Sequence, residues 1–158
     1  MLRWAPLVTR GPVLDVASGS GRHSRVFGAL EVVAVDRERQ SIAGVRFVQA
    51  DLEDGSPWPF AGQRFGGIVV TNYLHRPLLP ILRDALEAGG VLIYETFMLG
   101  NERYGKPSNP NFLLKPGELL QAFSALTVVA FEQGTSGKAV MQRICVIRAE
   151  ASSVRIAT

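Results

Sequence analysis

The sequence predicts a single α/β domain over residues 1–158, built on a doubly wound, mostly parallel sheet of seven strands that ends in an antiparallel hairpin. Three observations lead to this fold class. Apolar, β-branched runs alternate with helical stretches. Several of these runs are continuously apolar, which is typical of strands buried on both faces of a parallel sheet. The last two runs are joined by a turn-rich segment without a helical pattern, and such a short connection favours antiparallel partners.

The expected elements follow in chain order. Strands are predicted at the seven apolar runs 13–16, 32–35, 45–49, 68–71, 91–94, 127–131 and 144–148. Helices are predicted at 21–30, 78–88 and 116–123. The last has Pro116 and Glu118 in its first turn, where both residue types are favoured. The segment "EAGGV" at 87–91 is interpreted as a helix that ends on glycine before a buried strand. The connections "GRHSRVFGAL" and "RERQSIAG" are short, so we expect some shortened helices.

Composition narrows the classes of function. The net charge is only +3 and the basic residues are scattered, so the sequence does not indicate nucleic acid as a partner. No apolar run reaches the roughly 18 residues that a membrane span needs, and "MLRWAPLVTRGP" lacks the pattern of a secretion signal. Cys145 is the single cysteine, which excludes an internal disulfide and a cysteine-based metal cage. We therefore expect a cytoplasmic protein without a membrane partner or a metal.

A glycine turn follows the first strand in "LDVASGSGRHS". Gly19 and Gly21 come directly after a buried strand and before a helix, where glycine allows the backbone to turn tightly and to approach a ligand. Doubly wound sheets bind ligands over the carboxyl ends of their strands. Asp36 ends the second strand, and an acid there is suited to accept hydrogen bonds from ribose hydroxyls. The pattern predicts a nucleoside-binding unit.

The same turn discriminates between two kinds of nucleoside ligand. A dinucleotide fingerprint requires a third glycine, and Ser24 stands in that place. Asp15 would also repel a pyrophosphate, whereas its carboxylate suits a ligand with an ammonium or sulfonium group. The residues favour an adenosine with a positively charged tail over a nicotinamide dinucleotide.

The motifs "LDVASGSGRHS", "VVAVDRE", "VRFVQADLED", "FGGIVVTNYLHRPLL" and "LEAGGVLIYETF" together resemble class I S-adenosylmethionine-dependent methyltransferases over nearly the whole chain. The terminal hairpin also distinguishes that family from dehydrogenase domains. More narrowly, "VVTNYLHRPLL" and "YETFMLGNERYGKPSNPNFLLKPGELL" resemble a group of small bacterial proteins that includes tellurite-resistance-like enzymes. The resemblance implies S-adenosylmethionine as the cofactor and S-adenosylhomocysteine as its product.

The resemblance also implies roles for matched positions. Asp15 matches the acid near the methionyl amino group, Asp36 the acid that binds the ribose, and Asp51 the residue that contacts the adenine amino group. The other cofactor positions line the glycine turn, the adenine or the end of the fourth strand: Ala17, Gly19, Ser20, Gly21, Arg37, Leu52, Asn72, Tyr73 and Leu74. Ala17 often matches a glycine in the family, and Gly66 stands where an aspartate is common. Asp36 and Asp51 have an alternative interpretation as turn formers or helix caps.

The methyl acceptor is expected near two polar segments. In "TNYLHRP", His75 could act as a general base or take a structural role such as a helix cap, whereas Tyr73 is a weaker catalytic candidate that we expect to shape the pocket. The long, proline-containing loop at 96–117 is predicted to form a shaped lid, with an exposed loop as the alternative. The candidate acceptor contacts are Glu95, Met98, Arg103 and Tyr104.

The favoured function is methyl transfer from S-adenosylmethionine to a small-molecule acceptor, with a homodimer as a possible assembly. The alternatives are a cofactor-binding module without catalysis and an RNA methyltransferase. The latter ranks lower because "TNYL" lacks the Asn-Pro-Pro-aromatic run of many base-methylating enzymes. A nicotinamide-dependent oxidoreductase is the weakest alternative.

Overall fold

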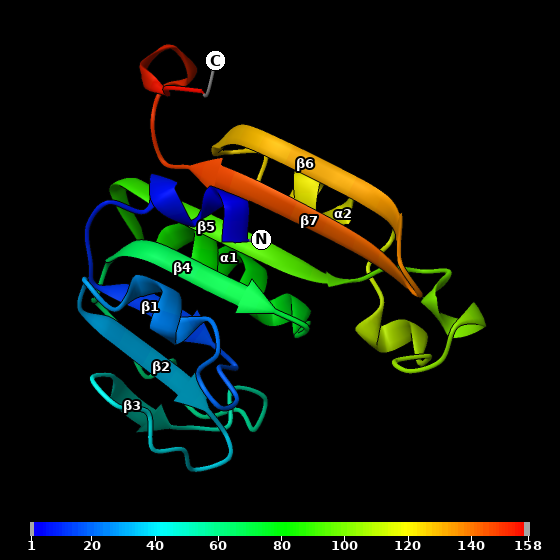
Figure 1. The fold of residues 1–158 in the computed structure, drawn as a ribbon, viewed down its shortest axis with the longest axis horizontal. Coiled ribbons are helices and arrows are strands. Elements are labelled where there is room, and N and C mark those ends of the chain that lie inside the picture. Colours follow the sequence, from blue (N-terminus) through cyan, green and yellow to red (C-terminus); the bar gives the residue numbers. More distant parts are fainter. Residues whose placement is uncertain (1, 157–158) are drawn as a thin grey trace.

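One twisted sheet runs through the computed structural model, which describes residues 2–156 (Figure 1). Its seven strands lie in the order β3-β2-β1-β4-β5-β7-β6. Strands β1 to β5 pair in parallel, and β7 runs antiparallel to both β5 and β6. The bounds are β1 Val13–Val16, β2 Val32–Asp36, β3 Arg46–Gln49, β4 Phe65–Thr71, β5 Leu86–Phe97, β6 Thr127–Ser136 and β7 Ala139–Ile147. The predicted fold class is confirmed, including its terminal hairpin.

The hairpin is longer than predicted. The ladder between β6 and β7 extends to the pair Ser136↔Ala139, so most of the segment expected to be turn-rich is strand. The turn itself holds only Gly137 and Lys138, and Gly137 has a φ of 60°, as short hairpin turns favour. Cross-strand pairing therefore overrides the turn propensity of this polar segment.

The helices are short, as the compressed connections predict. They are η1 Leu2–Leu7, η2 Ser24–Phe27, η3 Arg76–Leu78, α1 Leu79–Asp84, η4 Asn101–Arg103, η5 Pro110–Phe112, α2 Glu118–Ala122 and η6 Ala151–Ser153. The helix predicted at 21–30 is reduced to the single 3₁₀ turn η2. The helix predicted at 116–123 is represented by α2, which begins after Gly117 in the left-handed region. Among the described residues, no helix is long and apolar enough to span a membrane.

The prediction of a helix over 78–88 is wrong at its carboxyl end. Helix α1 ends at Asp84, and β5 begins at Leu86, so "EAGGV" belongs to a strand. The register between β4 and β5 shifts between Phe65↔Leu86 and Gly67↔Val91, which leaves an irregular stretch around Gly89, whose φ is 79°. A left-handed glycine ends helices and also permits bulges, and pairing with β4 selects the bulge here.

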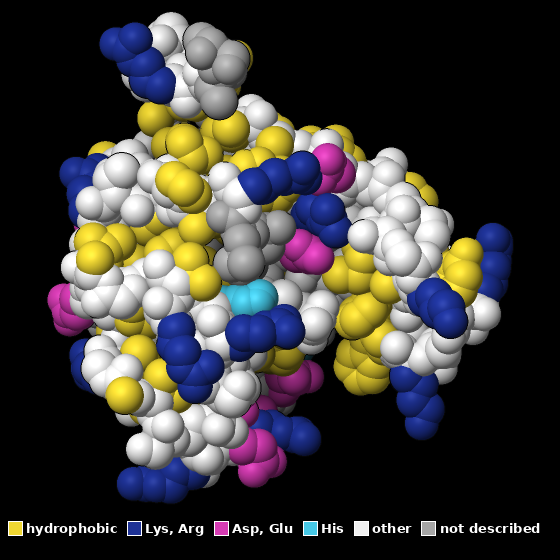
Figure 2. Space-filling model, in the orientation of Figure 1, with side chains coloured by type: hydrophobic (Ala, Val, Ile, Leu, Met, Phe, Trp, Pro, Cys, Tyr) yellow, Lys and Arg dark blue, Asp and Glu magenta, His cyan; other side chains and the backbone are white. Residues whose placement is uncertain are grey.

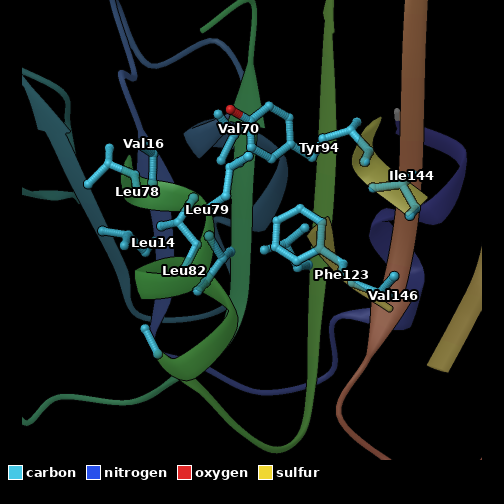
Figure 3. Packing of buried hydrophobic residues seen from close by; sticks show 14 of the residues in the cluster. Leu14, Val16, Val70, Leu78, Leu79, Leu82, Tyr94, Phe123, Ile144 and Val146 are labelled. Atoms are coloured by element: carbon cyan, nitrogen blue, oxygen red, sulfur yellow. The ribbon is translucent and has the colours of Figure 1, made fainter. Parts of the chain in front are cut away.

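Two apolar clusters cover the two faces of the sheet. The larger one contains Leu14, Val70, Tyr94 and neighbouring residues, against which α1 and α2 pack (Figure 3). The smaller one, on the face covered by η1 and η2, contains Trp4, Phe27, Val69, Ile93 and Cys145 among its members. Strands buried on both faces explain the continuous apolar runs in the sequence.

Residue 66, where the sequence resemblance implies an aspartate, is a glycine for a packing reason. A Cβ at this position would lie 2.2 Å from the carbonyl oxygen of Arg10 and 2.9 Å from its carbonyl carbon. The backbone N–H of Gly66 also donates to the carbonyl of Pro12 at 2.9 Å. The N-terminal segment therefore passes too close to β4 for any side chain at residue 66.

Candidate functional site

The carboxyl ends of β1, β2, β3 and β4 meet at one edge of the sheet and surround a cavity of about 230 Å³. Six predicted cofactor residues line it, together with Val35, Ala50 and Glu53: Ala17, Asp36, Arg37, Asp51, Leu52 and Tyr73. A wider cavity of about 700 Å³ adjoins it and shares Arg37, Asp51, Leu52 and Glu53; Trp58 and His75 are on its wall. Residues from four separate strand ends are thus brought to one cleft, as the sequence predicts.

The turn after β1 combines three left-handed residues. Ala17, Gly19 and Gly21 have φ values of 54°, 54° and 85°. A Cβ on Gly19 would meet no atom within 4 Å, so this backbone borders open space that a ligand can occupy. A Cβ on Gly21 would lie 2.7 Å from the side chain of Ile42, so this glycine is required by packing. Ser20, also in this turn, is exposed.

Asp36 fixes the glycine turn. Its Oδ2 accepts a hydrogen bond from the backbone N–H of Gly19 at 2.9 Å, and its Oδ1 accepts from Glu38 at 2.9 Å. Asp51 likewise accepts from the backbone N–H of Glu53 at 2.9 Å. Both acids therefore act as turn formers, and both side chains also line the cavity. Each carboxylate keeps acceptor capacity for a ligand, because a carboxylate has about four lone-pair sites.

Asp15 is buried, with 4% of its surface exposed, and its Oδ2 accepts a hydrogen bond from the Ser24 hydroxyl at 2.6 Å. Burial raises the pKa of Asp15 to about 6, an effect that the hydrogen bonds from Ser24 oppose and the charge of Asp36 reinforces. The side chain thus connects β1 to η2 beneath the glycine turn. Contact with a ligand's amino group stays a prediction for this residue.

The end of β4 forms another wall of the cleft. Asn72 is exposed and left-handed, with a φ of 55°. Tyr73 donates from its hydroxyl to Glu53 at 3.1 Å, and its carbonyl accepts from the Tyr94 hydroxyl at 2.7 Å. Burial and the neighbouring Glu53 raise the pKa of Tyr73 well above its usual value, so the phenol stays protonated and shapes the pocket. Leu74 lies in the larger apolar cluster, with 6% of its surface exposed.

His75 comes from the segment after β4 and lies beside Glu53 in this cleft. Its Nδ1 is 3.5 Å from Glu53, and its side chain lines the wider cavity. It occupies the N-cap position of η3, but its side chain makes no capping hydrogen bond, so the suggested capping role is wrong. The structural role that remains is the pairing with Glu53.

The sequence interpretation missed the second histidine, His23. Its Nδ1 lies 3.3 Å from the Thr71 hydroxyl oxygen at the end of β4. Burial and the charge of Arg22 lower the pKa of His23, while the charge of Glu95 opposes this shift. The available signal was its position two residues after Gly21, in the loop that carries the nucleoside-binding pattern.

The loop predicted as a lid is held in a fixed shape by buried polar groups. The side chain of Asn101, 2% exposed, accepts from the backbone of Val140 at 3.0 Å and donates to Pro107 at 3.0 Å. Met98 is buried in the larger core cluster, and contact between this side chain and an acceptor stays a prediction. Arg103 and Tyr104 are exposed on the loop, and Glu95 pairs with Arg143 at 3.4 Å. Whether the loop covers an acceptor stays a prediction.

A metal site is not apparent: no group of three or more histidine, cysteine, aspartate or glutamate side chains among residues 2–156 is placed to hold an ion.

Comparison with known proteins identifies the fold. No model of a protein family matches the sequence, and no curated protein matches it. The N-methyltransferase NodS from Bradyrhizobium japonicum WM9 superposes with a TM-score of 0.68 at 16% identity, over 94% of this chain and 93% of that one. TehB from Haemophilus influenzae gives 0.72 at 13% identity, over 93% of this chain and 60% of that one.

A third match is the 1,6-didemethyltoxoflavin-N1-methyltransferase from Burkholderia thailandensis, solved with 1,6-didemethyltoxoflavin and S-adenosylhomocysteine bound. It gives a TM-score of 0.67 at 18% identity, over 93% of this chain and 75% of that one. The chain has the class I S-adenosylmethionine-dependent methyltransferase fold. Within that class, the likeness to TehB agrees, at the level of the fold, with the narrower resemblance to the tellurite-resistance-like group.

Proposed function

We propose that this protein binds S-adenosylmethionine and transfers its methyl group to a small-molecule acceptor. The observation that carries the proposal is the joint placement of Asp36, Asp51 and the glycine turn around one cavity. Asp36 would accept hydrogen bonds from the ribose hydroxyls, and Asp51 would accept one from the adenine amino group. The bound cofactor supplies an electrophilic methyl group on a sulfonium, and methyl transfer then depends mainly on holding acceptor and donor in line.

The fold comparisons support the same cofactor, because solved structures with this fold contain S-adenosylhomocysteine. The glycine turn argues against a nicotinamide dinucleotide. Asp15 and Asp36 place two carboxylates against the turn that a diphosphate would have to approach.

Calorimetric titration with S-adenosylhomocysteine tests the proposal. We expect binding by the wild type and affinity at least about 10-fold weaker in Asp36→Asn, because one charge-assisted hydrogen bond contributes about 1.5–3 kcal/mol. Asp84→Asn is the matched control: Asp84 is an exposed aspartate at the end of α1, paired with Arg83, and its loss should leave the affinity unchanged. Correctly folded wild type that binds neither this ligand nor S-adenosylmethionine would refute the proposal.

Reduced nicotinamide dinucleotide, titrated in parallel by fluorescence, distinguishes the oxidoreductase alternative. A cofactor-binding module would bind S-adenosylmethionine yet transfer no methyl group to any acceptor in a broad panel.

A further inference from the structure

The segment that connects β3 to β4 leaves room beside the nucleoside cavity. Residues 50–64, all of them described, form turns and irregular backbone without a helix, whereas a crossover between parallel strands usually contains one. Two carboxylates shape the segment: Asp51 accepts from the backbone N–H of Glu53 at 2.9 Å, and Asp54 from that of Ser56 at 2.8 Å. The wider cavity of about 700 Å³ lies between this segment and η3 with α1.

Trp58 forms a fixed apolar wall of the wider cavity. Its ring lies 5.2 Å from that of Phe60, and the Phe60 ring lies 5.6 Å from that of Phe65, with both phenylalanines buried. Trp58 itself is half-buried, so part of the indole stays open to the cavity. The segment η3–α1 contributes further apolar lining residues: Pro77, Leu78 and Ile81. A volume of about 700 Å³ lies in the range of sites that bind small molecules.

The wider cavity begins at the adenine end of the proposed cofactor site. It shares with the nucleoside cavity Arg37, Asp51 and Leu52, the residues that the sequence resemblance assigns to the adenine. Of the described residues, Ala17 and Asp36, assigned to the glycine turn and the ribose, line the nucleoside cavity alone. The reacting methyl group would lie beyond the ribose, so the wider cavity is on the far side of the adenine from the chemistry.

We propose that the wider cavity is a subsite for an apolar, ring-sized substituent on the adenine amino group. This inference rests on the proposed function. An adenine amino group that carries one substituent keeps one N–H, which can still donate to Asp51 while the substituent enters the cavity beside Trp58. Contact with the indole and removal of the substituent's apolar surface from water favour this ligand over the unsubstituted cofactor.

Glu53 stands at the border between the two cavities and lines both. Its carboxylate accepts from the Tyr73 hydroxyl at 3.1 Å and lies 3.5 Å from Nδ1 of His75. Its side chain is 44% exposed, so the carboxylate can stay hydrated when an apolar group fills the cavity. The substituent therefore passes this charged group without burying it.

The first test is calorimetric titration with S-adenosylhomocysteine and with its derivative that carries one benzyl group on the adenine amino nitrogen. The benzyl derivative should bind the wild type about 5-fold more tightly, the gain expected from one aromatic contact. Trp58→Leu should remove this gain and leave the affinity for S-adenosylhomocysteine unchanged. Phe112→Leu is the matched control, because Phe112 is an exposed aromatic residue of the loop 96–117, and it should keep the gain.

A derivative with two methyl groups on the same nitrogen tests the orientation of the adenine. It has no N–H left for Asp51 and should bind about 10-fold more weakly than S-adenosylhomocysteine. Affinity equal to that of the parent ligand would show that the amino group does not face Asp51, and would overturn the inference.

Fluorescence gives a readout that leaves the subsite unmutated. The chain has two tryptophans, and Trp4 belongs to the smaller apolar cluster, on the face of the sheet that carries η1 and is turned to the viewer in Figure 2. Trp4→Phe therefore isolates the emission of Trp58. The benzyl derivative should change this emission more than S-adenosylhomocysteine does, and an equal change with both ligands would overturn the inference.

The outcomes separate the two proposals. Failure of the wild type to bind S-adenosylhomocysteine refutes the proposed function itself. If S-adenosylhomocysteine binds but the benzyl derivative binds no more tightly, or if its gain survives in Trp58→Leu, the proposed function stands and the subsite is refuted.

Discussion

Replacement of Asp15 by asparagine should stabilise the protein at neutral pH, although Asp15 lies in the candidate cofactor site. The carboxyl is 4% exposed, and its pKa is raised from 3.8 to about 6, chiefly by burial. Folding therefore favours the protonated form. This difference in pKa corresponds to about 3 kcal/mol of free energy of unfolding, at about 1.4 kcal/mol for each pKa unit.

The sign follows from proton linkage. Because the pKa is higher in the folded than in the unfolded chain, the stability contributed by protonated Asp15 is fully present below pH 3.8 and is lost as the pH rises through about 6. Asparagine carries no charge and has the same shape. The variant should match the wild type near pH 4 and exceed its free energy of unfolding by up to about 3 kcal/mol at pH 7.5.

Urea denaturation of both proteins at intervals from pH 4 to 8 measures this difference, and titrating groups that do not interact with Asp15 cancel in the subtraction. A stability difference that does not change with pH would refute the assigned pKa. Titration of the same variant with S-adenosylhomocysteine gives the functional counterpart: weakened binding would indicate that the carboxylate also contacts the ligand's amino group.

Three further predictions concern packing and backbone strain. Ala17→Gly should raise the free energy of unfolding by about 0.5–1 kcal/mol in urea denaturation, since Ala17 has a φ of 54°; a loss of stability would contradict the strain argument. Gln142→Leu should lower the free energy of unfolding by about 2 kcal/mol. The buried side chain of Gln142 accepts a hydrogen bond from the Leu119 backbone N–H at 2.7 Å and donates one to the Lys115 carbonyl at 2.9 Å, and leucine can make neither. An unchanged free energy of unfolding would show that water replaces these bonds. Cys145 is fully buried, and burial raises the pKa of its thiol to about 12. A thiol reagent at pH 8 should therefore label Cys145 only after unfolding. Rapid labelling of the native protein would contradict this burial.

The sheet could be predicted from the sequence because burial on both faces leaves continuous apolar runs at each strand. Helix lengths could not be predicted as well. The left-handed glycine at 89 ends a helix or permits a bulge with equal ease, and the choice depends on pairing between β4 and β5. The polar segment 132–136 similarly became strand because β7 pairs with it.

The meeting of Ala17, Asp36 and Asp51 at one cleft could be predicted because each lies at or just beyond the end of a recognisable strand, and parallel strands end at one edge of a sheet. The two histidines show where this reasoning stops. His75 lies in the segment after β4 and is a candidate from the sequence for that reason, yet the structure pairs it with Glu53. His23 comes from another loop and reaches the Thr71 side chain, a contact between residues 48 positions apart that no local pattern indicates.

The close passage of the Arg10 backbone over Gly66 limits what can be borrowed from distant relatives when this protein is engineered. A consensus substitution drawn from the methyltransferases that the sequence resembles would place an aspartate at residue 66. Here the Cβ of that aspartate would lie 2.2 Å from the carbonyl oxygen of Arg10, far inside the contact distance of two atoms. The substitution would therefore push the N-terminal segment away from the amino-terminal rim of the sheet. Redesign at the amino-terminal rim of the sheet therefore has to start from this chain's own packing.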